Sequence, residues 1–180
     1  MAMIDNNFIR RHVNSSDSII LRSIPGGSTV LKVPKFDVAI KFGGGVTENE
    51  AIAQATAFAV LDSAIIHVPK VLHFYCDSRT GIGYLTMEWI NGSPIDVQDC
   101  VQVDALQIAL DHLASVNRSF PRPISLGEPQ GILWEDGAPD EYHTVEGLEN
   151  WINLWQPTSV DLRGEDFVLC HLDTAADNML

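Results

Sequence analysis

The feature that most constrains the fold is a series of short apolar segments, separated by turn signals, between residues 19 and 42. IILRSI is followed by PGGS, TVLKV is followed by PKFD, and VAIKF closes the series. Runs of β-branched and apolar residues interrupted by Pro and Gly are typical of strands joined by tight turns. The spacing therefore predicts three consecutive strands of a small antiparallel sheet.

A helix and two further strands are predicted next. Thr47 precedes Glu50 by three residues, which is the pattern of a helix capping box, and Val68-Pro69 would end the segment. The apolar side chains that share one face of this helix are Ile52, Ala55, Phe58 and Ala59. VLHFYCD (71–77) and GYLTMEWI (83–90) have the composition of strands. We therefore expect five antiparallel strands with one helix inserted.

The second half of the chain is predicted to be helical. The breaker NGSP at 91–94 precedes two amphipathic stripes, one from Val103 to Val116 and one from Val145 to Trp155. Residues 119–144 between them are rich in Pro, Gly and acidic side chains, so we expect irregular structure there. The predicted fold class is therefore α+β. The predicted divisions are an N-terminal extension at 1–18, a sheet-containing lobe at 19–92 and a partial helical lobe at 93–180.

Composition narrows the classes of function. The formal net charge is −13, whereas nucleic acids and anionic membranes are bound by clusters of Lys and Arg, so we expect neither as a partner. The acidity is compatible with a cationic substrate, but on its own it is better explained by a role in solubility. No stretch approaches the roughly 20 apolar residues of a membrane span. The N-terminus does not resemble a secretory signal, and three scattered cysteines form no disulfide framework, so we expect a cytoplasmic protein.

The first candidate for chemistry is Lys41, on the third predicted strand, with Glu50 nine residues further on. Phosphoryl transfer depends on positioning and on a fixed positive charge beside the phosphates. A Lys on a rigid strand supplies that charge, and a Glu on the following helix would hold it in place. The alternatives are that Lys41 is simply solvated and that Glu50 serves only the capping box.

The second candidate is the tail. FVLC, a predicted short buried strand, leads into His171-Leu172-Asp173 and then Asn178. In kinase chemistry an Asp placed after such a strand orients the substrate hydroxyl, and an Asn five residues later binds the metal ion on the nucleotide. The alternative is an ordinary exit from a strand, because Asp and Asn favour turns in any protein.

The third candidate is the end of the fifth predicted strand, where Met87-Glu88-Trp89 is followed by Ile90 and Gly92. A strand that ends in this way can present backbone donors and acceptors to an adenine ring. The alternative is a strand that merely precedes a loop.

The order of the three candidates resembles the aminoglycoside and choline phosphotransferase family, whose fold is protein-kinase-like. The residues that carry the resemblance are Lys41, Glu50-Ala51, Met87-Glu88-Trp89 with Gly92, and His171, Asp173 and Asn178. It runs from about residue 19 to the end of the chain. It implies a five-stranded N-lobe with one helix and a partial helical C-lobe.

The resemblance also implies roles for these residues. Lys41 would hold the phosphates of ATP and Glu50 would orient it, while backbone groups of Glu88 and Ile90 would face adenine. Asp173 would be the catalytic base, His171 would organise its loop, and Asn178 would bind Mg²⁺. Gly26, Gly27 and Ser28 occupy the place of the loop over the phosphates. The substrate would be a small molecule with a hydroxyl group, and a cationic one would suit the charge.

Residues 128–149 form an acidic segment where the substrate-facing insert of the family falls, and the segment suits either attraction of a cation or a solvated acidic face. The sequence departs from the family pattern at three points. Leu172 stands where the family has Gly, and Asp177 is an acid beside the metal-binding Asn178. The family places a second metal-binding Asp further along than Leu180, so we expect a C-terminally truncated chain with no measurable phosphotransfer. The alternatives are a non-catalytic kinase-like protein that binds a nucleotide or a partner, and a truncated gene product without independent function.

Overall fold

The computed structural model describes residues 3–93, 95–96, 98–119, 123–125 and 144–169. The chain divides into two units, which are Met1–Ser63 with His67–Asn91 and Ala64–Ile66 with Gly92–Leu180.

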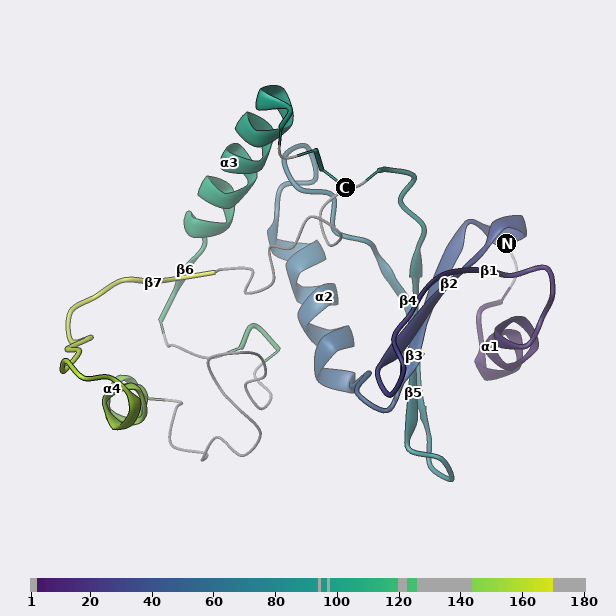
Figure 1. The fold of residues 1–180 in the computed structure, drawn as a ribbon, viewed down its shortest axis with the longest axis horizontal. Helices are drawn as coiled ribbons and strands as arrows, with labels where there is room; N and C mark the ends of the chain where they lie inside the picture. The colour runs from purple at the N-terminus through teal and green to yellow at the C-terminus, as the bar shows by residue number, and fades with distance from the viewer. Residues whose placement is uncertain (1–2, 94, 97, 120–122, 126–143, 170–180) are drawn as a thin grey trace. The chain divides into compact units, whose positions relative to one another are not determined.

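The first unit is built on the predicted five-stranded antiparallel sheet (Figure 1). Its strands are β1 (Ile19–Ser23), β2 (Ser28–Val33), β3 (Val38–Gly43), β4 (Val71–Asp77) and β5 (Ile82–Glu88), and a 3₁₀ turn, η1 (Pro34–Phe36), joins β2 to β3. Their order in the sheet is β1-β2-β3-β5-β4. The strand that carries Lys41 therefore lies at the centre, with a hydrogen-bonded neighbour on each side.

Helices α1 (Asn6–Val13) and α2 (Glu48–Val60) lie on opposite faces of this sheet (Figure 1). Side chains alternate between the two faces of a strand. On one face, Phe8 and Ile9 of α1 are buried against alternate residues of β2 and β3, which are Leu31, Val33, Val38 and Ile40. On the other face, Ala51 of α2 packs against Leu85 of β5. The two layers fix the sheet and leave the α2 face with few buried side chains.

Helix α1 occupies part of the segment for which the sequence predicted only an extension. Asp5 caps it by accepting a hydrogen bond from the Phe8 amide (2.8 Å), and Ile9 is fully buried. The His12 ring lies 4.2 Å from the Phe8 ring, centroid to centroid. The N-terminal segment is therefore part of the core of the first unit.

Helix α2 differs from the prediction at its end and in its buried face. It ends at Val60, eight residues before Val68, because Leu61 takes an extended conformation. The predicted apolar face is wrong, because Ile52 and Phe58 are 42% and 41% exposed. The helix is rich in Ala on all sides, so hydropathy marked no clear face. The positions that meet the sheet include polar side chains, and these contribute to the site described below.

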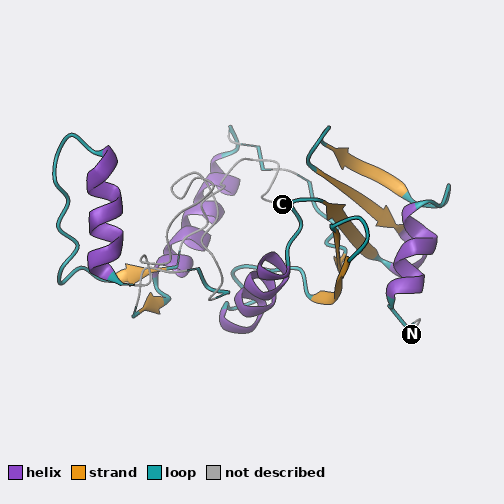
Figure 2. Cartoon of the chain, turned by 90° about the horizontal axis from the view of Figure 1, so that it is seen from below, coloured by secondary structure: helices purple, strands orange, loops and turns teal. Residues whose placement is uncertain are grey.

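The second unit contains α3 (Cys100–Ala114), β6 (Asn117–Arg118), α4 (Val145–Trp155) and β7 (Phe167–Val168) (Figure 2). Both predicted helices are present, and Asp99 and Thr144 cap them. The predicted strand at 167–170 is represented by β7, which pairs with β6 in antiparallel orientation. It is not buried as predicted, since Val168 is 42% exposed. None of the described helices is long and apolar enough to cross a membrane.

Candidate functional site

The predicted ion pair between Lys41 and Glu50 is confirmed. Lys41 on β3 and Glu50 on α2 place the amine Nζ and the carboxylate Oε1 2.5 Å apart. The two side chains remain 30% and 29% exposed. The pair therefore fixes the amine while leaving part of it accessible to a bound anion.

The start of α2 aims Glu50 at Lys41. Thr47 caps the helix, and its hydroxyl accepts a hydrogen bond from the Glu50 amide (3.3 Å). The Glu50 carboxylate contacts Lys41, so the interpretation of Glu50 as no more than a capping acid is wrong. The helix places Glu50 on the side that faces the sheet, nine residues after its partner.

The connection from β3 to α2 crosses the sheet closely. Val46 is 4% exposed, and its carbonyl lies against Gly83 of β5, where a Cβ atom would collide with that oxygen. Only a glycine at residue 83 leaves room for the Val46 carbonyl to lie this close to β5. Gly83 therefore helps to set where α2 begins, and with it the position of Glu50.

The predicted phosphate loop lies beside the end of β3. The Gly27 amide donates to the Ile24 carbonyl (2.9 Å), and Gly26 has a φ angle of 74°. Pro25 followed by a glycine with positive φ fits a type II turn. Ser28 pairs with Gly43, two residues beyond Lys41 on β3. The structure thus brings Gly26, Gly27 and Ser28 to the end of the sheet where Lys41 is found.

Among the described residues, two backbone groups at the end of β5 have no hydrogen-bond partner. The Glu88 amide donates to the Lys70 carbonyl (2.9 Å), but no described residue donates to the Glu88 carbonyl. The Ile90 amide likewise has no hydrogen-bond partner among the described residues. In an extended chain, a carbonyl and the amide two residues further on point to the same side. Glu88 and Ile90 therefore supply one acceptor and one donor on the same side of the strand end.

Trp89, between these two residues, anchors the strand end. Its amide donates to the Asp37 carbonyl (3.1 Å), which continues the pairing with β3 by one residue. The amine of Lys32 lies 4.3 Å from the centroid of its ring, a distance typical of a cation–π contact. Residue 89 is thus held against the sheet, while the Glu88 carbonyl and the Ile90 amide beside it have no partner among the described residues.

Gln54 belongs to this region and was missed by the sequence analysis. It lies one helical turn after Glu50, and its side-chain amide donates to the Pro69 carbonyl (2.7 Å). The contact ties α2 to the segment that enters β4. The available signal was a second polar side chain at a spacing of four in a helix otherwise rich in apolar residues.

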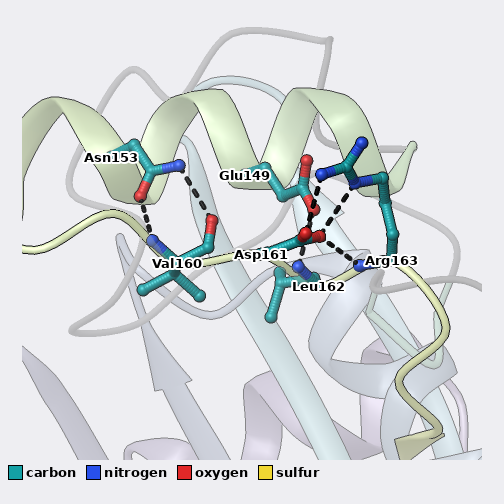
Figure 3. Close-up of polar contacts among 6 residues, drawn as sticks. All are labelled: Glu149, Asn153, Val160, Asp161, Leu162 and Arg163. Atoms are coloured by element: carbon teal, nitrogen blue, oxygen red, sulfur yellow. Dashed lines mark hydrogen bonds and ion pairs between the residues drawn. The ribbon is translucent and has the colours of Figure 1, made fainter.

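In the second unit, α4 holds the segment that leads to β7 (Figure 3). The Asn153 side chain accepts from the Val160 amide (2.7 Å) and donates to the Val160 carbonyl (3.0 Å). Glu149 accepts from the Leu162 amide (2.6 Å). Arg163 donates to both carboxylate oxygens of Asp161 (2.9 and 2.7 Å) and holds the pKa of that carboxyl well below its ordinary value. Side chains of α4 therefore fix the backbone of this segment at Val160 and Leu162.

The predicted catalytic and metal-binding residues, His171, Asp173 and Asn178, lie outside the described residues. The same is true of Asp177 and of most of the acidic segment at 128–149. Within the part of the chain that is described, no group of three or more His, Cys, Asp or Glu side chains could hold a metal ion. The described part of the candidate site consists of Lys41, Glu50, the turn at residues 26–28 and the strand end at residues 88–90.

The sequence model of the phosphotransferase enzyme family matches residues 9–180. No curated protein and no solved structure is significantly similar to the chain. The family match covers both units, and it includes the tail that lies outside the described residues.

Proposed function

This chain belongs to the phosphotransferase enzyme family, and on that premise we propose that it transfers a phosphoryl group from ATP to a hydroxyl group of a small molecule. The observation that carries the proposal is the ion pair between Lys41 and Glu50 on the central strand of a kinase-like sheet. A cation fixed in this way suits a reaction whose catalysis consists mostly of positioning and electrostatic stabilisation.

The described residues supply partners both for the base and for the phosphates of an adenine nucleotide. The unpaired Glu88 carbonyl can accept from the amino group of adenine, and the unpaired Ile90 amide can donate to the ring. Lys41 and the turn at residues 26–28 lie at the other end of the sheet, where the phosphates would be held. When bound, ATP supplies the phosphoryl group and Mg²⁺ neutralises part of its charge.

The remaining roles rest on the family pattern. Asp173 would accept the proton of the substrate hydroxyl, His171 would organise the loop, and Asn178 would bind Mg²⁺. These residues occur at the spacing that the reaction requires, His-x-Asp followed by Asn five residues after the Asp.

Charge supports a cationic substrate. Residues 1–92 contain eight basic and eight acidic side chains, whereas residues 93–180 contain three and sixteen, so the whole net charge of −13 belongs to the second half. A region of one sign raises the local concentration of ligands of the opposite sign. We therefore infer that the substrate carries amino groups and is bound by the residues that follow Gly92.

Nucleotide binding tests the first half of the proposal. Replacing Lys41 by Ala should weaken ATP binding by about 10- to 100-fold, the effect of losing one hydrogen bond to a charged group. Adenosine, which has no phosphates, should bind both proteins equally. Lys35→Ala is the matched control, because Lys35 lies in η1 and is exposed. Equal ATP affinity in wild type and Lys41→Ala would contradict the role of Lys41.

An ATP-consumption assay with aminoglycosides, choline and simple sugars tests the second half. Substrate-dependent turnover that disappears in Lys41→Ala would support the transfer reaction and contradict the expectation of an inactive chain. ATP binding without turnover would instead favour the non-catalytic alternative.

A further inference from the structure

The pairing between β5 and the residue before β4 is irregular at Glu88. In a regular hydrogen-bonded pair of antiparallel strands, each residue donates to the carbonyl of the other. Here the Glu88 amide donates to the Lys70 carbonyl (2.9 Å). The Lys70 amide does not return the bond to the Glu88 carbonyl, because it donates to the Glu88 carboxylate Oε2 instead (3.2 Å).

The Glu88 side chain thus takes the donor that would otherwise occupy its own carbonyl. His67 Nε2 lies 3.3 Å from the same carboxylate oxygen and helps to hold it. The hydrogen bond from the Lys70 amide is the largest cause of the lowered pKa of Glu88, ahead of the contact with His67. These contacts therefore favour the deprotonated form of the Glu88 side chain.

We propose that Glu88 is a positioning residue, whose side chain keeps its own backbone carbonyl available to the amino group of adenine by accepting the Lys70 amide in its place. The inference rests on the proposed binding of ATP at this strand end. Without the carboxylate, the Lys70 amide would complete the regular strand pair and occupy the acceptor that adenine needs.

The test compares ADP with inosine diphosphate, whose base carries an oxygen where adenine carries the amino group and so cannot donate to the Glu88 carbonyl. Isothermal titration should show ADP binding weakened by about 2- to 10-fold in Glu88→Ala, the effect of one net hydrogen bond. Binding of inosine diphosphate should not change. Because Glu88 is 37% exposed, Glu88→Ala should fold, which circular dichroism would check.

Glu88→Gln is the matched control. Its side-chain carbonyl can still accept from the Lys70 amide, so ADP affinity should return to that of the wild type. It lacks the negative charge, as Glu88→Ala does, so a purely electrostatic effect would appear equally in both variants.

The outcomes separate the inference from the proposed function. If the wild type binds ADP but Glu88→Ala binds it equally well, or loses ADP and inosine diphosphate to the same extent, the inference is wrong and ATP binding stands. If the wild type binds neither ADP nor ATP, the proposed function and the inference fail together.

Discussion

Gly83 shows how one residue can constrain the site without contacting a ligand. A Cβ atom at this position would collide with the Val46 carbonyl, and a backbone atom cannot move aside as the end of a side chain can. The connection that places Glu50 next to Lys41 therefore depends on residue 83 having no Cβ atom.

We predict that Gly83→Ala lowers the free energy of unfolding by about 1–3 kcal/mol, as overpacking of a tight contact does. Gly45→Ala is the matched control, since a Cβ atom there meets nothing within 4 Å. Urea denaturation of the two variants would measure the difference. Equal stability of both variants would show that the connection between β3 and α2 adjusts freely.

Glu88 supplies a prediction on pH. Its pKa is lowered, first by the hydrogen bond from the Lys70 amide and also by His67. A carboxyl whose pKa is lower in the folded state contributes stability that is present above its ordinary pKa, about 4.3, and is lost as the pH falls through the lowered value. NMR titration should therefore place the Glu88 midpoint below the value measured for the same residue in urea-unfolded protein. A midpoint equal to or above the unfolded value would contradict the contact.

The residue scale also shows what the sequence could predict. The pairing of Lys41 with Glu50 could be predicted from the capped helix that follows the strand Lys and from the order of the motifs along the chain. The unpaired carbonyl of Glu88 could not be deduced. It depends on whether the Lys70 amide donates to that carbonyl or to the Glu88 carboxylate. The tail motif of Asp173 and Asn178 stays a prediction.

Among the elements, α4 acts as a support for the chain that approaches β7. The Asn153 side-chain amide bonds to both the N–H and the C=O of Val160. It therefore makes the two hydrogen bonds that a neighbouring strand would make. Such a contact gives order to a segment that has no regular hydrogen bonding of its own.

We predict that Asn153→Ala increases the hydrogen-exchange rate of the Val160 amide and lowers local stability by about 1–3 kcal/mol, the cost of leaving backbone groups without partners. Asn150→Ala, an exposed Asn on the same helix, should leave that rate unchanged. Equal exchange in the wild type and in Asn153→Ala would mean that other contacts hold the segment.

Elements differed in how well the sequence predicted them. The five strands followed from turn residues, which act locally and are independent of what packs against the sheet. Helix α1 was missed because only a few apolar side chains, chiefly Phe8 and Ile9, form its buried face. Asp5 as an N-cap was the signal that could have revealed it. The prediction of which face of α2 is buried was wrong for the opposite reason, since too many of the positions in this helix are apolar.

For the whole molecule, the uneven distribution of charge predicts how a cationic ligand binds. Attraction between exposed charges is screened over about 10 Å at 0.1 M salt. The affinity for an aminoglycoside should therefore fall several-fold between 50 and 500 mM NaCl. The affinity for an uncharged sugar of similar size should change little, and isothermal titration at both salt concentrations would measure each. Affinity for the aminoglycoside that does not depend on salt would contradict the cationic-substrate proposal.

The strand order has a consequence for the order in which parts of the first unit fold during synthesis. β1, β2 and β3 are neighbours in sequence and in the sheet, and Lys41 meets Glu50 after only nine residues, so the loop-closure entropy of these contacts is small. β3 pairs with β5 only across a far longer separation, from Val38 to Glu88. The pairing of β1, β2 and β3 can thus form while the nascent chain is still short. Docking of β5 comes later, and it brings both Gly83, which sets the position of Glu50, and the strand end at Glu88. We therefore expect the turn at residues 26–28 to take its place beside β3 before the rest of the site is assembled.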